Sequence, residues 1–337
     1  MSIIRNLSIH NYKSVRQLEI SCERINVFLG KPNAGKSNIL EAISLFGALY
    51  HTNTCKFMGD TIRYQAISNL FSNYNTKNSV TVKINGCYAE LSLLTNTQEY
   101  ELNVTTDTNR STSRFPKFNI IFNSSGLGMS GSFGNQNRGL IKKYDFKRLE
   151  QGSDLEGFLI PPYGNNFFSI VRSNEPLKNA IKEFAEEYGF KLLLDVETKE
   201  IAFAQIENDV FIKFQTYLLP DTFQRYIFHL AAILSNEKSV LLFEEPETHS
   251  YGPYVYQLAQ EILQDEGGNQ FFLTTHNPYL LTPLLQEGKT DLAVFITWFE
   301  DYQTKVRRLE QDEIASILQH GYDVFLNLDN YIHADAS

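Results

Sequence analysis

The sequence predicts an α/β protein with a mixed, largely parallel central sheet, an antiparallel β subdomain and an inserted helical and loop region. Three observations support this fold class. An apolar run at residues 25–29 leads into a glycine-containing octapeptide and then into a helical pattern at 37–50. In the last third of the chain, apolar strands alternate with helices, which is typical of a parallel sheet. Three short strand-like runs within 79–106 are separated by turn residues and indicate an antiparallel meander.

Composition limits the classes of protein that need consideration. The chain has 337 residues, 42% of them hydrophobic, and a formal net charge of −9. This acidic balance argues against a protein whose whole surface binds nucleic acid. The longest apolar runs are strand-sized and the first residues lack a signal-peptide pattern, so we expect no membrane span and a cytoplasmic protein. The 3 cysteines show no C-x-x-C pair, which favours free thiols.

Residues 1–106 form the predicted N-terminal lobe. Partial alternation indicates strands at 3–10 and 17–20, which precede the strand at 25–29, the first long helix and the meander.

Residues 107–215 form the predicted inserted region. Residues 123–139 are rich in Gly, Ser and Asn, and we expect a mobile loop there. A helix is predicted from Pro176 to its C′ residue Gly189, followed by strands within 191–214. A solvated face is the favoured interpretation of a basic cluster in this region, ahead of contact with nucleic acid or a partner. The cluster contains Arg138, Lys142, Lys143, Lys147 and Arg148.

Residues 216–337 form the predicted C-terminal lobe, in which strands and helices alternate. The expected elements are helices at 222–235, 253–264 and 312–319 and strands at 240–243, 271–274, 292–298 and 303–309.

The octapeptide from Gly30 to Ser37, GKPNAGKS, fits the pattern G-x-x-x-x-G-K-S/T between a strand and a helix. In a loop of this kind the backbone N–H groups and the helix N-terminus bind phosphate. Lys36 is then expected to reach the β- and γ-phosphates, and the Ser37 hydroxyl to bind Mg²⁺. A glycine turn that matches by chance is the alternative, and the flanking strand and helix argue against it.

Two carboxylates, Glu244 and Glu245, end the buried strand that begins at Ser239. Ligands of parallel sheets bind beyond the carboxyl ends of the strands. We therefore expect Glu244 to hold Mg²⁺ through a water molecule and Glu245 to act as the base that deprotonates the attacking water. An acidic cap on the following helix is the alternative.

The next strand, 270–275, ends at His276. A histidine at this position can hydrogen-bond the γ-phosphate or the attacking water. A structural histidine is the alternative, and His249 is a weaker candidate that could lie at a dimer face or simply pack.

These three segments, in this order, resemble those of ABC-type ATPases and, within that class, the SMC/RecF/OLD group, of which the chain looks like an OLD-like member. IHNYKSV at residues 9–15 is similar to the N-F/Y-K/R-S motif of the group, and GKPNAGKSN at 30–38 to its phosphate loop. LLFEEPETH at 241–249 and TTHNPYLL at 274–281 resemble the acidic and switch-histidine motifs.

The resemblance implies further site residues. Lys13 and Ser14 would contact the nucleotide, and Gln65 would contact Mg²⁺ or water. A signature helix beginning near 219–225 would reach the γ-phosphate of a second subunit, with Arg225 either supplying charge in trans or forming a structural salt bridge. The nucleotide would also be bound by the phosphate loop and its flank through Gly30, Asn33, Ala34, Gly35, Lys36, Ser37 and Asn38.

The chain departs from the group in four places. Pro220 and Thr222 stand where the signature helix commonly has serine and glycine, although Asp221 or Thr222 could still cap the helix. Glu244 replaces an aspartate. The stretch 277–337 is too short for a Toprim nuclease domain, and no heptad run predicts a coiled-coil arm, so the chain resembles a stand-alone ATPase head.

The resulting prediction is an ATP- and Mg²⁺-dependent ATPase that forms a head-to-head homodimer or a higher homo-oligomer. Lacking an effector domain, it would switch a partner protein, a nuclease or toxin, in bacterial defence against phage, and nucleic acid would be reached through that partner. Alternatives are a RecF- or SMC-like DNA-repair ATPase that binds duplex DNA, a slowly hydrolysing nucleotide-dependent scaffold and, more weakly, a small-molecule kinase.

Overall fold

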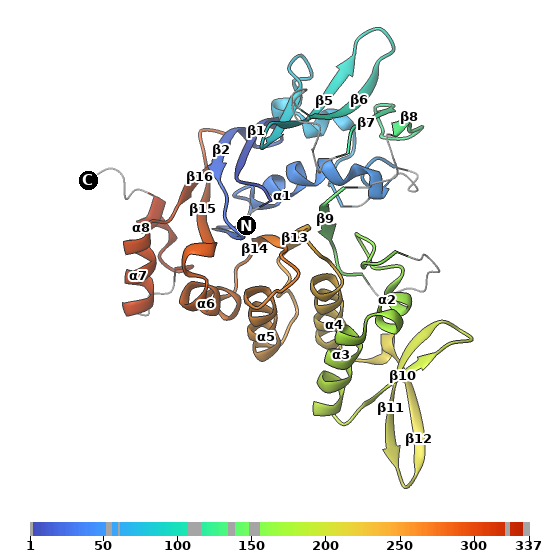
Figure 1. Ribbon diagram of the computed structural model, residues 1–337. Helices are drawn as coiled ribbons and strands as arrows, with labels where there is room; N and C mark the ends of the chain where they lie inside the picture. The colour runs from blue at the N-terminus through green and yellow to red at the C-terminus, as the bar shows by residue number, and fades with distance from the viewer. Residues whose placement is uncertain are drawn as a thin grey trace.

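The computed structural model describes residues 3–51, 56–59, 61–106, 116–133, 139–147, 156–320 and 324–332. The described strands form a central six-stranded sheet, a seven-stranded sheet and a projecting three-stranded sheet (Figure 1).

The central sheet has the strand order β16-β15-β3-β14-β13-β9. All neighbouring strands are parallel except β15 and β16, which are antiparallel. The carboxyl ends of β3, β14 and β13 therefore lie at one edge, with Glu244 beside Thr274 and Thr274 beside Phe28. The strands are β3 (Ile25–Gly30), β9 (Ile141–Tyr144), β13 (Val240–Glu244), β14 (Gln270–Thr274), β15 (Leu292–Glu300) and β16 (Gln303–Arg308).

The seven-stranded sheet is antiparallel and confirms the predicted meander at β4, β5 and β6. The prediction of a loop over 123–139 is wrong for residues 130–133, because they form strand β8, which pairs with β7. Gly131 permits the pairing, since a Cβ atom there would lie 2.0 Å from the Asn119 carbonyl oxygen. Residues 134–138 lie outside the described residues. The strands are β1 (Asn6–Tyr12), β2 (Val15–Ser21), β4 (Val80–Ile84), β5 (Cys87–Leu94), β6 (Glu99–Thr106), β7 (Phe118–Phe122) and β8 (Ser130–Phe133).

Strands β7, β8 and β9 fall within the predicted inserted region, but β7 pairs with β6 of the N-terminal lobe and β9 pairs with β13 of the C-terminal lobe, while β8 extends the sheet by pairing with β7. Residues 118–122, 130–133 and 141–144 therefore take part in the sheets that the lobes build.

Helix α1 (Lys36–Ser44) lies between these two sheets (Figure 1). Its apolar residues Ile39 and Ile43 are fully buried in a core shared with Leu242 of β13 and Val82 of β4. The helix predicted to reach residue 50 continues beyond Ser44 as the 3₁₀ helix η1 (Leu45–His51). This packing holds the start of α1 rigidly at the strand edge.

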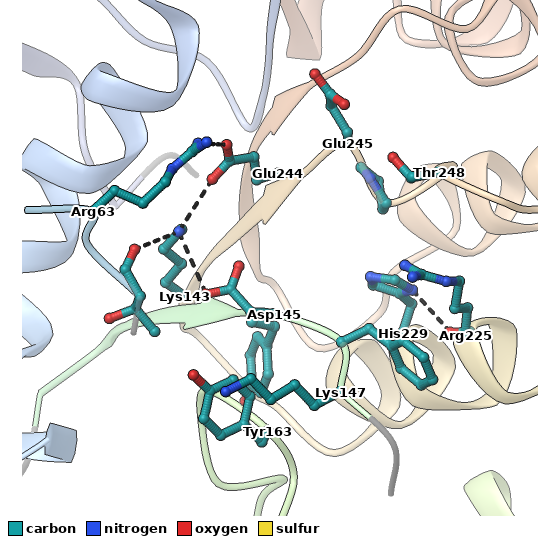
Figure 2. Close-up of a pocket in the computed structure, with 14 residues that line it drawn as sticks. Arg63, Lys143, Asp145, Lys147, Tyr163, Arg225, His229, Glu244, Glu245 and Thr248 are labelled. Atoms are coloured by element: carbon teal, nitrogen blue, oxygen red, sulfur yellow. Dashed lines mark hydrogen bonds and ion pairs between the residues drawn. The ribbon is translucent and has the colours of Figure 1, made fainter. Parts of the chain in front are cut away.

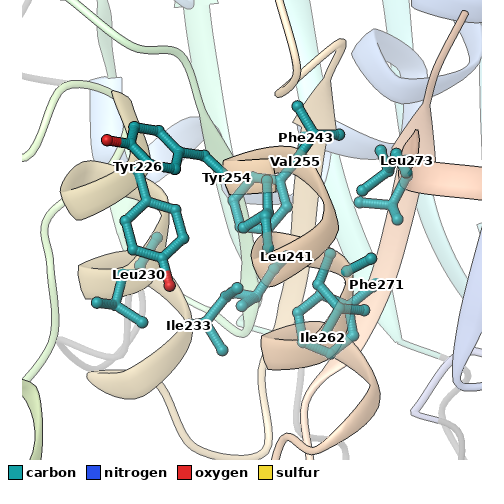
Figure 3. Packing of buried hydrophobic residues seen from close by; sticks show 14 of the residues in the cluster. Tyr226, Leu230, Ile233, Leu241, Phe243, Tyr254, Val255, Ile262, Phe271 and Leu273 are labelled. Carbon is teal, nitrogen blue, oxygen red and sulfur yellow. The ribbon is translucent and has the colours of Figure 1, made fainter. Parts of the chain in front are cut away.

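Three helices pack against the other face of the central sheet. Figure 3 shows the contact of α4 and α5 with β13 and β14. The predicted helices at 222–235 and 253–264 are confirmed as α4 and α5, whereas α6 was not predicted. Leu241 and Phe243 of β13 face these helices, and Val240 and Leu242 face α1, so both faces of the sheet are buried. The helices are α4 (Asp221–Leu234), α5 (Gly252–Leu263) and α6 (Pro278–Glu287).

The three-stranded sheet carries a hairpin that projects from the body of the molecule (Figure 1). The helix predicted from Pro176 to Gly189 is confirmed, and Gly189 has a positive φ of 74°. The strands predicted within 191–214 are also confirmed. The elements are α2 (Phe167–Ser173), α3 (Glu175–Glu187), β10 (Lys191–Asp195), β11 (Glu200–Glu207), β12 (Val210–Gln215) and η4 (Thr216–Leu218).

The remaining elements are short helices. None of the helices within the described ranges is long and apolar enough to cross a membrane. They are η2 (Ile67–Leu70), η3 (Ser72–Tyr74), η5 (Lys289–Asp291), α7 (Gln311–His320) and α8 (Leu328–Ile332).

Candidate nucleotide-binding site

Three segments that are remote in the sequence meet around one cavity of about 560 Å³ at the carboxyl edge of the central sheet. These segments are the octapeptide loop before α1, the acidic pair at the end of β13 and the histidine after β14. The predicted residues that line it are Ser14, Asn33, Ala34, Gly35, Lys36, Ser37, Asn38, Glu244, Glu245 and His276, joined by Pro32 and Arg63.

The octapeptide loop needs both of its glycines. A Cβ atom on Gly30 would lie 2.1 Å from the Thr297 carbonyl oxygen, and one on Gly35 would lie 1.9 Å from the Thr304 hydroxyl. Gly35 also has a φ of 98°, which favours glycine. The Lys36 ammonium donates to the carbonyl oxygens of Gly30 at 2.8 Å and Lys31 at 3.0 Å, so it lies within the curve of the loop.

A chain of polar contacts braces this loop from the side. Asn38 donates to the Ser14 hydroxyl at 2.7 Å, and the Ser14 and Thr304 hydroxyls lie 2.7 Å apart. Thr304, on β16, donates to the Ala34 carbonyl oxygen at 3.0 Å. Sequence reasoning did not identify Thr304, because nothing in its local pattern marks it.

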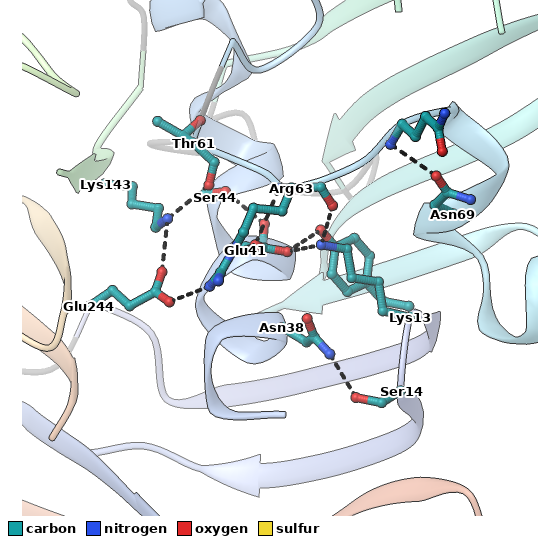
Figure 4. Close-up of polar contacts among 12 residues, drawn as sticks. Lys13, Ser14, Asn38, Glu41, Ser44, Thr61, Arg63, Asn69, Lys143 and Glu244 are labelled. Atoms are coloured by element: carbon teal, nitrogen blue, oxygen red, sulfur yellow. Dashed lines mark hydrogen bonds and ion pairs between the residues drawn. The ribbon is translucent and has the colours of Figure 1, made fainter. Parts of the chain in front are cut away.

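Gly30, Lys13 and Gln65 were also predicted to belong to the site, but they are not among the residues that line the cavity. The Lys13 ammonium is paired with the buried Glu41 carboxylate and donates to the Arg63 carbonyl oxygen at 2.8 Å (Figure 4). Gln65 is exposed, and its backbone N–H donates to the Asn69 side chain at 2.9 Å. From the same loop, Arg63 reaches the cavity instead. Nucleotide contact by Lys13 and metal contact by Gln65 stay predictions.

Glu244 is held by three partners from three elements. Arg63 Nη2 lies 2.7 Å from Oε1, Lys143 Nζ lies 3.2 Å from Oε2, and the Ser37 hydroxyl forms a hydrogen bond to the carboxylate. Burial raises the pKa of Glu244, but Lys143, Ser37 and Arg63 together outweigh burial and hold this pKa below its usual value. The group is therefore ionised at neutral pH.

The oxygens of Ser37 and Glu244 fit a Mg²⁺ ion in their chemistry, because Mg²⁺ prefers hydroxyl and carboxylate ligands together with water and phosphate oxygens. The hydrogen bond between them shows that they converge on the same space beside the phosphate loop.

Glu245 and His276 form a second pair of side chains at the cavity. His276 Nε2 lies 3.3 Å from Glu245 Oε1, and both side chains are partly exposed to the cavity. Burial and the nearby Lys36 charge lower the pKa of His276, against the opposing effect of Glu245. The imidazole is therefore mainly neutral at pH 7. The backbone N–H of Glu245, which has a φ of 44°, donates to the carbonyl and hydroxyl oxygens of Thr274.

Glu247 supports the site through hydrogen bonds, and sequence reasoning missed it. Its side chain accepts a hydrogen bond from the Thr275 hydroxyl at 2.6 Å and from the backbone N–H of His276 at 2.9 Å. It is buried, and burial raises its pKa. Glu247 thus ties the histidine loop to the acidic loop. Glu247 is the third glutamate of the E-E-P-E sequence at 244–247, and its closeness to the acidic pair was an available signal.

The basic cluster is largely not a solvated face, and that prediction is wrong for Lys142 and Lys143. Both are buried on β9. Lys142 donates to Asn236 and Ser239 and lies 3.6 Å above the Phe158 ring, while Lys143 contacts Glu244. The prediction failed because clustered lysines are typical of a solvated surface, whereas these two lie on β9, which pairs with β13 in the central sheet. Lys147 is exposed, and Arg138 and Arg148 lie outside the described residues.

The start of α4 carries no side-chain cap, so capping by Asp221 or Thr222 is wrong. Pro220 occupies the N-cap position, and the Thr222 hydroxyl accepts from the backbone N–H of Tyr251 at 3.0 Å. Arg225 pairs with Asp221 at 2.6 Å and lies 4.7 Å from the Phe146 ring, which bears out the structural salt bridge within one chain. His249 is exposed and does not line the phosphate cavity.

Comparisons with known proteins agree with this geometry. A structure described as an SMC head bound to the C-winged helix domain of ScpA matches with a TM-score of 0.54 and 14% identity, covering 94% of this chain and 100% of that one. An SMC head with an extended coiled coil, bound to the C-terminal domain of ScpA derived from Pyrococcus furiosus, matches with a TM-score of 0.51 and 14% identity, covering 95% and 99%. At this identity the likeness establishes the shared fold.

A search of curated proteins returned no match. A family model described as "AAA domain, putative AbiEii toxin, Type IV TA system" matches residues 25–282, which include the phosphate loop, the acidic pair and His276. With this match over most of its length, on the fold of an SMC-like head, the chain belongs to that family of P-loop ATPases.

Proposed function

We propose that this protein hydrolyses ATP by direct attack of water on the γ-phosphate. The observation that carries the proposal is the 3.3 Å contact between Glu245 and His276 in the same cavity as Lys36 and Ser37. A phosphate loop explains nucleotide binding, and a carboxylate paired with a neutral imidazole beside it supports activation of water.

Each residue has a distinct role in this mechanism. The loop N–H groups and Lys36 bind and neutralise the phosphates, and Ser37 and Glu244 hold Mg²⁺, which offsets the negative charge of the phosphates when bound. Glu245 accepts the proton of the attacking water. Neutral His276 donates a hydrogen bond from one ring nitrogen and accepts one at the other, so it can orient water between Glu245 and the γ-phosphate.

The test is multiple-turnover phosphate release by the purified protein with ATP and Mg²⁺. Glu245→Gln keeps the shape of the side chain and removes the base, so we expect roughly a hundredfold loss of kcat or more with ATP binding retained. Glu266→Gln, at an exposed glutamate outside the cavity, is the matched control. Equal turnover by wild type and Glu245→Gln would refute the role of Glu245.

A head-to-head homodimer that encloses ATP is the second part of the proposal. Its support is the SMC-head fold and a phosphate cavity that opens at the surface with Glu245 and His276 still partly exposed. Glu245→Gln should accumulate as a dimer in ATP and stay monomeric without it, measured by light scattering after gel filtration. A monomer under both conditions would contradict dimerisation.

A protein partner that reads the nucleotide state is the third part, in keeping with a family description that names a toxin and a toxin–antitoxin system. The surface that supports it is the β11–β12 hairpin, where Ile206, Val210 and Phe211 are 51%, 60% and 62% exposed. Exposed apolar groups of this size mark protein interaction sites. The hairpin leads through η4 directly into α4, so a bound partner would be linked to the start of that helix.

Co-expression with the products of neighbouring genes tests this surface. Phe211→Ser should abolish co-purification of a defence effector, whereas Phe299→Ser, at a phenylalanine of β15 with 52% exposure, should not. Undiminished binding by Phe211→Ser would exclude the hairpin as the docking site.

The competing proposal is a nucleotide-dependent scaffold that hydrolyses ATP slowly, and one observation favours it. Glu244 already carries two cationic partners, Arg63 and Lys143, which compete with a metal ion for its oxygens. Multiple turnovers at a rate of order 1 s⁻¹ would exclude it, since this is the usual lower range for enzymes.

A further inference from the structure

We propose that Lys143 is a positioning residue that acts as a built-in cation. It holds Glu244 toward the phosphate loop and keeps divalent metal ions from binding behind Glu244 when no nucleotide is present. The metal-binding part stands on geometry alone, and the effect on turnover rests on the proposed ATPase function.

The Lys143 ammonium lies at a point where three oxygens from three segments converge. Its Nζ atom is 2.8 Å from the Thr61 carbonyl oxygen, 3.2 Å from Glu244 Oε2 and 3.4 Å from Asp145 Oδ2. The side chain is 3% exposed, so water replaces none of these contacts easily. Two carboxylates and a carbonyl around one buried point form the oxygen set that Mg²⁺ or Mn²⁺ prefers.

A second cavity, of about 360 Å³, lies behind Glu244, and no residue of the phosphate loop lines it. Figure 2 shows the side chains around this cavity. Lys143, Asp145, Glu244 and Glu245 line it, and Glu244 and Glu245 also line the phosphate cavity. The acidic pair therefore forms a wall between two cavities. Without the Lys143 charge, Asp145 would lose its lysine partner and Glu244 would keep only Arg63 as a cationic partner, so the two carboxylates would attract a cation to the rear side.

The two cations on Glu244 differ in how freely they can leave it. The Arg63 side chain is 73% exposed and also lines the phosphate cavity, whereas Lys143 is buried on a strand of the sheet. Arg63 can therefore leave Oε1 and free that oxygen for a cation, while Lys143 keeps its hold on Oε2 (Figure 4). This division also explains a glutamate in place of aspartate, because the longer side chain spans from Lys143 on β9 to Ser37 on α1.

The first test measures binding of Mn²⁺ to the nucleotide-free protein by electron paramagnetic resonance. We expect weak binding by wild type and at least about tenfold tighter binding by Lys143→Met, because removal of a cation next to two carboxylates removes its repulsion of the metal. Lys143→Arg should stay close to wild type. The double variant Lys143→Met/Asp145→Asn should also return close to wild type, since only one carboxylate then remains at the point of convergence.

Lys142→Met is the matched control. Lys142 is the preceding residue on the same strand and is equally buried, but its hydrogen bonds go to Asn236 and Ser239. Its loss should leave Mn²⁺ affinity unchanged. A purely structural role for Lys143 would instead lower thermal stability in both lysine variants without tightening metal binding in either.

The second test separates positioning from binding. Lys143→Met should bind ATP in the presence of EDTA as wild type does, and its Mg²⁺-dependent kcat should fall about tenfold or more, with recovery in Lys143→Arg. Unchanged Mn²⁺ affinity in Lys143→Met, or a double variant that still binds as tightly as Lys143→Met, would overturn the proposal. If Lys143→Met does not fold, tight Mn²⁺ binding by Lys143→Arg overturns it and weak binding supports it.

The two proposals fail in different ways. A wild-type protein that does not hydrolyse ATP defeats the proposed function, yet the nucleotide-free Mn²⁺ measurements still decide whether Lys143 excludes metal.

Discussion

Replacing Glu247 by alanine should remove the hydrogen bonds that hold the loop with Thr275 and His276 in place. The substitution removes the acceptor of two donors, the buried Thr275 hydroxyl at 2.6 Å and the partly buried His276 N–H at 2.9 Å. A buried donor left without a partner costs roughly 1–3 kcal/mol. Removal of a buried carboxylate, whose raised pKa reports its desolvation, offsets part of this cost. The free energy of unfolding should therefore fall by about 2–4 kcal/mol.

Glu247→Gln separates the hydrogen bonds from the charge. Its amide oxygen can still accept from Thr275 and His276, and its amide nitrogen takes the place of Oε2, for which no hydrogen-bond partner is found among the described residues. We expect its stability to lie within about 1 kcal/mol of wild type.

Urea unfolding and steady-state phosphate release provide the two measurements. Glu247→Ala should also lose roughly ten- to a hundredfold in kcat, because His276 is no longer held 3.3 Å from Glu245, whereas Glu247→Gln should keep most of it. Wild-type stability and turnover in the alanine variant would refute this reasoning. So would a glutamine variant as impaired as alanine, because the charge and not the hydrogen bonds would then be essential.

Two further predictions concern acid stability and nucleotide affinity. Burial lowers the pKa of His229 to about 4, below the ordinary 6.5. Between these two values the unfolded chain binds a proton that the folded chain does not bind. The free energy of unfolding should therefore fall as pH decreases from 6.5 to 4, by at most about 1.4 kcal/mol per pH unit. His229→Asn can still donate to the Arg225 carbonyl oxygen but does not titrate, and urea unfolding across this range should show a shallower slope than wild type; parallel profiles would contradict the assignment. Arg63→Ala should change stability by less than about 1 kcal/mol, since the side chain is 73% exposed, yet weaken ATP binding about tenfold in a fluorescent-nucleotide titration. Unchanged ATP affinity would show that Arg63 serves Glu244 alone.

Local sequence was sufficient for the phosphate loop and for most of the strands and helices of the core. The loop follows from short-range requirements, since Gly35 has a φ of 98° between a buried strand and a helix start. The apolar runs at β13 and β14 identified buried parallel strands because both faces of the sheet are covered. Helix α6 was not predicted, because it contains Pro278 and Pro283 and proline is uncommon inside helices.

The histidine and the acidic pair were also predicted to lie together, because neighbouring parallel strands end at one edge. That rule does not say which side chains reach across from other elements. Arg63 and Glu244 are in contact although 181 positions separate them in the sequence, and Thr304 and Ser14 are in contact across 290 positions.

The sequence by itself determined that a phosphate loop, an acidic strand end and a strand-end histidine share one sheet edge, because each depends on local backbone preferences and apolar periodicity. Only the tertiary structure decided that Lys143 is buried against Glu244, that Arg63 and not Gln65 reaches the cavity, and that Glu247 holds His276. The physical reason is strand order: the position of β9 beside β13 turns a run of lysines from expected surface into internal counter-charges, and no local pattern encodes which strand becomes the neighbour.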